Sequence, residues 1–457
     1  SFKLMVDAVL NHVSTQSEWF QGFLRGDEKY REYFITVDPS TDLSMVVRPR
    51  DLPLLTPVET SWGTQYVWTT FSRDQIDLNY HNPDVLLEMI DILLFYIEQG
   101  ADIIRLDAIA YLWKEIGTTC IHLPQTHAVV QLFRAIVDEV APGVLLITET
   151  NVPHAENISY FGDGTNEAHL VYQFPLPPLV AHAFMRGTAR HLTEWAAGLE
   201  APSEQTSFFN FTASHDGVGV RPLAGLLGEE ELEALIEQTH ASGGQVSYKL
   251  NPDGSKSPYE LNVTYFDLLN PPGRGESLSL QVRRFLASQA IMLALAGMPG
   301  IYFHSLLGSR NYLEGVKKTG YPRTINREKL DVREVEAALA DPRSLRHAVF
   351  TGYRSLLQKR IAEKAFHPNA EQRVLSLNEA VFSLLRVAPS GEEAIIALHN
   401  VSTTGQPITI NLHELELTIP AGHLRDIVSG ATWAVEQPAS FAFELEPYQV
   451  AWLKVLP

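Results

Sequence analysis

The sequence predicts an α/β protein built on parallel strands, with a small antiparallel β domain at its C-terminal end. Up to about residue 305, short apolar strands alternate with amphipathic helices. Such alternation implies parallel strands joined by right-handed crossovers, with the helices outside. From residue 367 onward the runs become short and alternate with period two, as in "QPITINLHELELTI", which is typical of half-buried antiparallel strands.

Local signals define the first elements. "FKLMVDAV" reads as a buried strand, and residues 14–80 read as a long irregular excursion rich in Pro, Asp, Ser and Trp. Residues 82–100 have helix signals at both ends, because Asn82 suits the N-cap, Pro83 the first turn and Gly100 the position after the last turn.

The remaining elements follow the same pattern. The segment 227–278 is polar and reads as a loop excursion. Helices are predicted near 125–140 and over 279–297. Further strands are predicted at "ADIIRLDAIA" (101–110), "GVLLITETN" (143–151), "AHLVYQFP" (168–175), "TSFFNFTASHD" (206–216) and "GIYFHS" (300–305). With the opening strand, this gives six parallel strands.

Composition excludes several classes of protein. The 457 residues carry a net charge of −19, which argues against a nucleic-acid or anionic-membrane partner. No apolar run reaches membrane-spanning length. The single cysteine, Cys120, allows no intrachain disulfide, so a cytoplasmic location is the simplest expectation.

Charged side chains at strand ends are the main chemical signal. Period-two alternation places Arg105 and Asp107 on the same face of an otherwise apolar strand, where a charge is costly unless it is paired. Glu149 and Asp216 end two other strands. Parallel strands bring such ends to one rim, and paired carboxylates are the minimum for glycoside chemistry. A neighbouring arginine keeps an attacking carboxylate ionised, and Arg105 suits that role for Asp107.

Four short motifs occur in order: "DAVLNH" (7–12), "IIRLDA" (103–108), "LITET" (146–150) and "ASHDG" (213–217). They resemble the signature regions of glycoside hydrolase family 13, the α-amylase family. The resemblance implies a (β/α)8 TIM barrel, with loop excursions and a C-terminal antiparallel β domain. It divides the chain into a barrel at 1–13 and 81–366, excursions at 14–80 and 217–278, and a β domain at 367–457.

The resemblance also implies roles for individual residues. Asp107 matches the nucleophile, Glu149 the general acid/base and Asp216 the carboxylate that stabilises the transition state. Arg105 matches the residue that orients the nucleophile. His12 and His215 match the pair that binds the glucose hydroxyls. Asp7 and Asn11 are expected to shape the barrel rim, and the family leaves calcium near Asn11 as an open alternative to the expectation of no metal.

Further segments are similar to the sucrose phosphorylase branch of the family, in which phosphate rather than water releases the glucosyl group. They are "VVRPRDLP" (46–53), "YVWTTFSRDQIDLN" (66–79), "YELNVTYF" (259–266) and "TINR" (324–327). Arg50 and Tyr111 match the residues that help to hold phosphate. The other expected substrate-binding positions are Phe71, Tyr259, Glu260, Asn262 and Arg327.

The acceptor side departs from sucrose phosphorylase. Glu260 stands where that branch usually has Gln, and "IHLPQTH" (121–127) and the stretch 303–331 look most like the neighbouring glucosylglycerate phosphorylase group. Lys317, Lys318 and Arg323 either add positive charge for an anionic acceptor or coat a solvated loop; both interpretations stay open.

These features predict a retaining α-glucoside phosphorylase that needs no cofactor besides phosphate as co-substrate. The alternatives are an α-glucoside hydrolase or transglucosidase with the same three acids and, from another class, a non-catalytic barrel subunit. The resemblance begins at the third barrel strand, so we expect two more β/α units ahead of Ser1 in the complete protein. A homodimer is left open.

Overall fold

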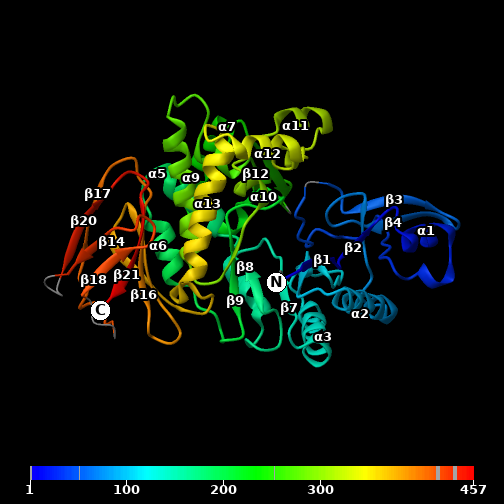
Figure 1. The fold of residues 1–457 in the computed structure, drawn as a ribbon. Helices are drawn as coiled ribbons and strands as arrows, with labels where there is room; N and C mark the ends of the chain where they lie inside the picture. Colours follow the sequence, from blue (N-terminus) through cyan, green and yellow to red (C-terminus); the bar gives the residue numbers. More distant parts are fainter. Residues whose placement is uncertain (1–2, 51, 252, 418–421, 436–439) are drawn as a thin grey trace. The chain divides into compact units, whose positions relative to one another are not determined.

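Parallel strands form the centre of the first of two units into which the chain divides in the computed structural model, which describes residues 3–50, 52–251, 253–417, 422–435 and 440–457. This unit comprises residues 1–172, 202–206 and 248–259. Its strands β1 (Met5–Val9), β6 (Ile103–Asp107), β7 (Leu145–Thr148) and β8 (Leu170–Tyr172) are hydrogen-bonded in that order and all run parallel (Figure 1).

Two long helices accompany these strands (Figure 1). Helix α2 (Pro83–Glu98) confirms the predicted helix, since the Asn82 side chain accepts a hydrogen bond from the Asp84 amide and Pro83 lies in the first turn. Helix α3 (Pro124–Val140) likewise follows the prediction. A short helix, α4 (His154–Ile158), follows β7.

The excursion after β1 has more regular structure than its composition suggested. It contains β2 (His12–Ser14), α1 (Glu18–Arg25), the antiparallel hairpin of β3 (Leu55–Thr60) and β4 (Gly63–Trp68), and β5 (Gln75–Asp77), which pairs with β2. The irregular interpretation of this segment was therefore wrong. The hairpin was hidden because Pro57 lies inside a strand, where proline usually argues against a sheet.

The second unit comprises residues 173–201, 207–247 and 260–457. Strand β9 (Ser207–Phe211) pairs in parallel with β13 (Met298–Gly300). Strand β10 (Val218–Gly219) pairs antiparallel with β12 (Lys256–Asn262), which contributes residues to both units. Strand β11 (Gln245–Leu250) also contributes residues to both units. The other elements up to residue 366 are α5 (Leu176–Arg186), α6 (Arg190–Ala197), α7 (Glu229–Ala241), α8 (Tyr265–Leu269), α9 (Leu278–Ala294), α10 (Phe303–Leu306), α11 (Leu313–Thr319), α12 (Val332–Ala340) and α13 (Leu345–Ala362).

Three predictions in this unit need correction. Strand β9 ends at Phe211 rather than Asp216, and the Asp216 amide donates to the Ser214 hydroxyl in a local turn. Where a strand was predicted at 300–305, strand β13 already ends at Gly300 and helix α10 begins at Phe303. The segment 227–278 contains helix α7, whose first turn carries three glutamates that favour a helix N-terminus.

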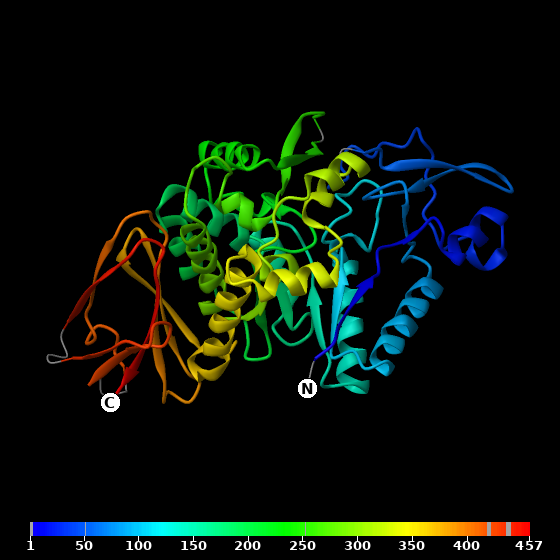
Figure 2. The same cartoon turned by 45° about the horizontal axis from the view of Figure 1, so that its top comes forward.

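The C-terminal strands are antiparallel, as predicted. Helices α9 and α13 run side by side next to them in the second unit (Figures 1 and 2). One sheet has the order β14-β15-β16-β21-β18-β19, and β17 pairs with β20. The strands are β14 (Glu371–Asn378), β15 (Val381–Val387), β16 (Ala394–Asn400), β17 (Gln406–Ile410), β18 (His423–Asp426), β19 (Thr432–Ala434), β20 (Phe441–Leu445) and β21 (Val450–Leu456).

Two buried arginines connect the end of helix α9 to its surroundings. Arg386, on β15, donates to the carbonyl of Ala294, and Arg360, on α13, donates to that of Leu293. Burial lowers the pKa of Arg360 to about 10 and that of Arg386 to about 9. The two guanidinium groups therefore satisfy carbonyls at the helix C-terminus, where positive charge is favourable.

Candidate active site

The predicted site residues fall into two groups, one in each unit. The first unit holds Asp107, Glu149, Arg105, His12, Phe71, Tyr111, Arg50 and Tyr259. The second unit holds Asp216, His215, Glu260, Asn262 and Arg327.

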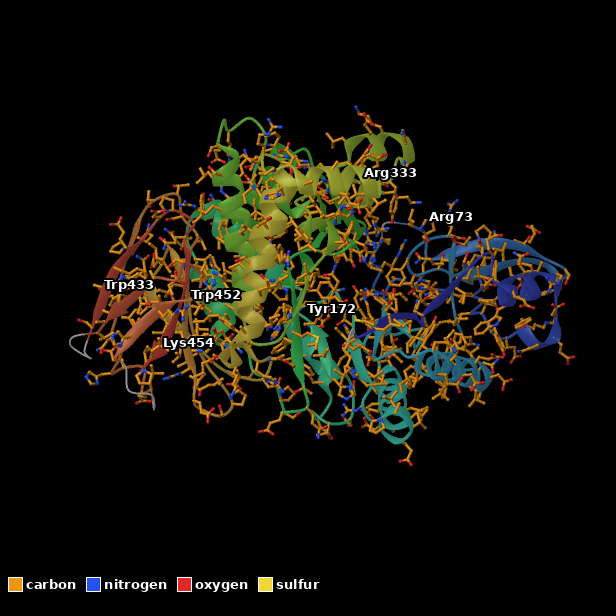
Figure 3. All side chains as sticks on the ribbon, in the orientation of Figure 1. Arg73, Tyr172, Arg333, Trp433, Trp452 and Lys454 are labelled. Carbon is orange, nitrogen blue, oxygen red and sulfur yellow. The ribbon has the colours of Figure 1, made fainter. Side chains whose placement is uncertain are left out.

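Arg105 is the centre of the first group. Its Nη1 lies 2.6 Å from Oδ1 of Asp107 and 2.6 Å from Oδ1 of Asp7, and its Nη2 lies 3.9 Å from Oε2 of Glu149. Its Nε donates to the hydroxyl of Tyr172, at the end of β8 (Figure 3). Burial disfavours the charge, but the carboxylates, Glu149 foremost, outweigh it and raise the pKa of Arg105. The arginine therefore stays charged and forms an ion pair with Asp107.

The backbone turns sharply directly after Asp107. Ala108 has a φ of 52°, in the left-handed region that non-glycine residues rarely adopt. Its N–H points to Oε2 of Glu149 at 3.5 Å. A backbone conformation of this kind costs roughly 1–3 kcal/mol and is found mainly at functional sites. Here it brings the segment after Asp107 to the Glu149 carboxylate.

His12 lies in a buried polar and aromatic setting. Its Nε2 is 2.8 Å from the side-chain nitrogen of Gln75, and its ring centroid is 5.4 Å from that of Phe71. Phe71 in turn packs edge-on against Tyr111 at 5.3 Å. Burial lowers the pKa of His12, against the opposing influence of nearby carboxylates. The structure therefore brings together three residues that the sequence placed in separate motifs.

A buried lysine that the sequence did not single out supports this group. Nζ of Lys114 lies 2.7 Å from Oδ2 of Asp77 and donates to Oδ1 of Asn11 at 2.7 Å. Asp77 and Asn11 are 0% exposed. Burial lowers the pKa of Lys114, and Asp77 opposes that shift. Its ammonium thus occupies the oxygen cluster around Asn11, where calcium was the open alternative. The described residues include no group of three or more His, Cys, Asp or Glu side chains that could hold a metal ion.

Arg50 and Tyr259 are in contact in the first unit. The guanidinium carbon of Arg50 lies 4.9 Å from the centre of the Tyr259 ring, a cation–π arrangement. Arg50 is half-buried and Tyr259 is buried. The sequence motifs that carry these residues are more than 200 positions apart, so their contact could not be deduced from spacing.

Asp216 is held by arginines in the second group. Its Oδ1 lies 2.5 Å from Nη1 of Arg323 and 3.0 Å from Nη2 of Arg327. Arg327 also donates through Nε to the carbonyl of His215, and Asn326 donates to the carbonyls of Ser214 and Asp216. The short 3₁₀ helix Pro322–Asn326 and its C-cap Arg327 thus fix the whole segment around Asp216.

The three basic side chains for which an acceptor role and a solvated-loop role were both left open differ in burial and pairing. Lys317 and Lys318 are exposed. Arg323 is largely buried and is paired with the carboxylates of Asp216 and Glu260, so its charge is neutralised locally. Asn262 is 0% exposed and donates to the Ser247 hydroxyl.

Comparison with known proteins shows which family this chain is similar to. The model of the α-amylase catalytic domain matches residues 1–218. A glucosylglycerate phosphorylase of Spirochaeta thermophila is 55% identical over 99% of this chain and 77% of that protein. The glucosylglycerate phosphorylase of Escherichia coli K12 is 49% identical over 85% of this chain and 69% of that protein.

The chain belongs to the α-amylase family. Within that family it is an enzyme of the glucoside phosphorylase type. A sucrose phosphorylase of Agrobacterium vitis is 32% identical over 75% of this chain and 70% of that protein. The crystal structure of sucrose 6F-phosphate phosphorylase from Thermoanaerobacter thermosaccharolyticum shares the fold, with a TM-score of 0.75 at 24% identity over 88% of this chain and 80% of that one. None of the helices in the described part of the chain has the length and apolar character that a membrane crossing requires.

Proposed function

We propose that this α-amylase family member is a retaining α-glucoside phosphorylase that acts on glucosylglycerate. It would transfer the glucosyl group to phosphate through a covalent ester on Asp107. The observation that carries the mechanism is the charged cluster of Arg105, Asp107 and Glu149, in which one guanidinium lies beside both carboxylates. The substrate is taken from the names of the relatives that are 49–55% identical.

In the first displacement, an oxygen of Asp107 would attack the anomeric carbon while the bond from that carbon to the acceptor oxygen breaks. Glu149 would give its proton to the departing oxygen, which releases glycerate. Arg105 would orient the nucleophile, because its Nη1 contacts Oδ1 of Asp107 at 2.6 Å. Asp216 would stabilise the positive charge that develops on the sugar.

In the second displacement, a phosphate oxygen would attack the same carbon from the face that the acceptor left. Glu149 would take the phosphate proton, the ester bond to Asp107 would break, and α-glucose 1-phosphate would form. Two inversions retain the configuration. Arg50, next to Tyr259, is the side chain that we assign to phosphate, because a guanidinium offers it charge-assisted and often bidentate hydrogen bonds.

The test is a panel of α-glucosides, glucosylglycerate and sucrose first, assayed for glucose 1-phosphate with and without phosphate. We expect phosphate-dependent release from glucosylglycerate. Equal release of free glucose in the presence of phosphate would support hydrolysis or transglucosylation instead. Arg50→Gln should raise the KM for phosphate, whereas Arg25→Gln, which removes an exposed arginine of the same unit, should leave it unchanged. A cytoplasmic location and a homodimer remain part of the proposal, to be checked by fractionation and by the mass in solution.

A further inference from the structure

Arg323 lies between two carboxylates that the sequence assigned to different roles. Its Nε and Nη2 donate to the two carboxylate oxygens of Glu260, at 2.8 and 2.7 Å. Its Nη1 lies 2.5 Å from Oδ1 of Asp216. Burial disfavours the charge of Arg323, but Glu260 and Asp216 outweigh it and raise the pKa of this side chain. The arginine is therefore a permanent cation that two acids share.

The two carboxylates do not share it equally. A guanidinium binds a carboxylate best through two parallel N–H groups, and Glu260 occupies the Nε–Nη2 edge that provides them. The carboxylate of Asp216 lies at the remaining terminal nitrogen, Nη1. Glu260 is 2% exposed, so water does not compete for its side of the arginine.

The backbone keeps Glu260 close to Asp216. Glu260 lies opposite Gly219 in the ladder between β12 and β10, which begins two residues after Asp216. A Cβ at Gly217 would lie 2.5 Å from Cγ of Glu260, so only glycine at this position leaves room for the glutamate. The close approach is thus built into the chain next to Asp216.

We propose that Glu260 is a positioning residue for Asp216: it engages the Nε–Nη2 edge of Arg323 and so keeps the Nη1 end of that arginine on the Asp216 carboxylate. Without Glu260, the two parallel N–H groups would turn to Asp216 and hold both of its oxygens. The carboxylate would then be turned away from the sugar. This role rests on the proposed function, in which Asp216 stabilises the transition state, and it differs from the contact with the acceptor that the sequence predicts for Glu260.

The test uses reactions without an acceptor. Hydrolysis of α-glucosyl fluoride and arsenolysis of glucose 1-phosphate both require Asp216 but involve no glycerate. We expect Glu260→Gln to lower kcat by about 100-fold in both reactions with little change in KM, since a displacement of about 1 Å in a reacting group has effects of that size. Glu276→Gln is the matched control, because Glu276 binds the buried Arg284 through two oxygens outside this group. The control should leave kcat unchanged.

The double variant shows whether Glu260 acts through Arg323. In an Arg323→Gln background, Glu260→Gln should have no further effect on α-glucosyl fluoride hydrolysis, whereas independent roles would give multiplied losses. A loss confined to reactions with glycerate would overturn the proposal and make Glu260 an acceptor contact. Circular dichroism and thermal unfolding of each variant check that the fold is retained. Glu260→Asp, which keeps the charge but shortens the side chain, should recover part of the kcat that Glu260→Gln loses. If the unmodified enzyme hydrolyses α-glucosyl fluoride but forms no glucose 1-phosphate, the proposed phosphorylase function is refuted. The role of Glu260 can still be tested in that case, because α-glucosyl fluoride hydrolysis does not depend on phosphate.

Discussion

The buried ion pair of Lys114 and Asp77 gives the sharpest stability prediction. The side chains are 2% and 0% exposed, and Nζ lies 2.7 Å from Oδ2. Lys114→Met keeps most of the side-chain volume but leaves the Asp77 carboxylate without its cation. Asp77 would retain hydrogen bonds from the Thr70 amide and hydroxyl and from Asn11. Breaking a buried pair on one side costs about 3–5 kcal/mol, and we expect a loss within that range.

Urea unfolding followed by tryptophan fluorescence would measure this loss, since Trp68 and Trp113 belong to the same unit as Lys114. The midpoint should fall while the slope of the free energy against urea stays constant. Adding Asp77→Asn to Lys114→Met should recover part of the stability, because the orphaned charge is then gone. A loss below about 1 kcal/mol, or strictly additive effects of the two changes, would show that Lys114 and Asp77 do not form the buried ion pair that we describe.

Three further predictions concern other parts of the chain. Asp107→Asn should abolish nearly all turnover of α-glucosyl fluoride without lowering the melting temperature; retained activity would refute its role as nucleophile. Arg386→Met should lower the free energy of unfolding by about 2–5 kcal/mol, measured in urea, because four carbonyls lose a charged donor. Burial lowers the pKa of His399 from 6.5 to about 4, so its neutral form stabilises the fold above pH 6.5 and that contribution is lost as the pH falls toward 4. His399→Gln should reduce the slope of stability against pH in this window by about 1.4 kcal/mol per pH unit; an unchanged slope would mean that His399 does not titrate there.

Much of the first group could be predicted because it lies on regular strands. The alternation in "IIRLDA" placed Arg105 and Asp107 on the same face, and both contact one another in the structure. The helix around Asn82 was recognised from its cap, since capping is a local interaction between neighbours in sequence.

Other features depend on contacts that a single sequence does not display. The sequence did not single out Lys114, which is buried because Asp77 and Asn11, from distant segments, contact its ammonium. For Arg323 the sequence left open a charge for an anionic acceptor or a solvated loop charge, and it did not display the pairing with the carboxylates of Asp216 and Glu260. Which side chains from distant segments pair depends on which loops come together in the fold. The local periodicity of a sequence contains no information about that.

The arginines at the end of helix α9 have a consequence for how the chain can be divided. The change of pattern at residue 367 suggests a boundary at which a barrel might be separated from a β domain. Arg386 lies beyond that boundary, yet it donates to the Ala294 carbonyl before it. Trp452, on β21 (Figure 3), packs against Phe366 with ring centroids 4.8 Å apart. A polypeptide cut at this point would leave the Ala294 carbonyl at the end of helix α9 without its arginine donor and Phe366 without its Trp452 partner, so the β domain is a structural part of this unit rather than a detachable module.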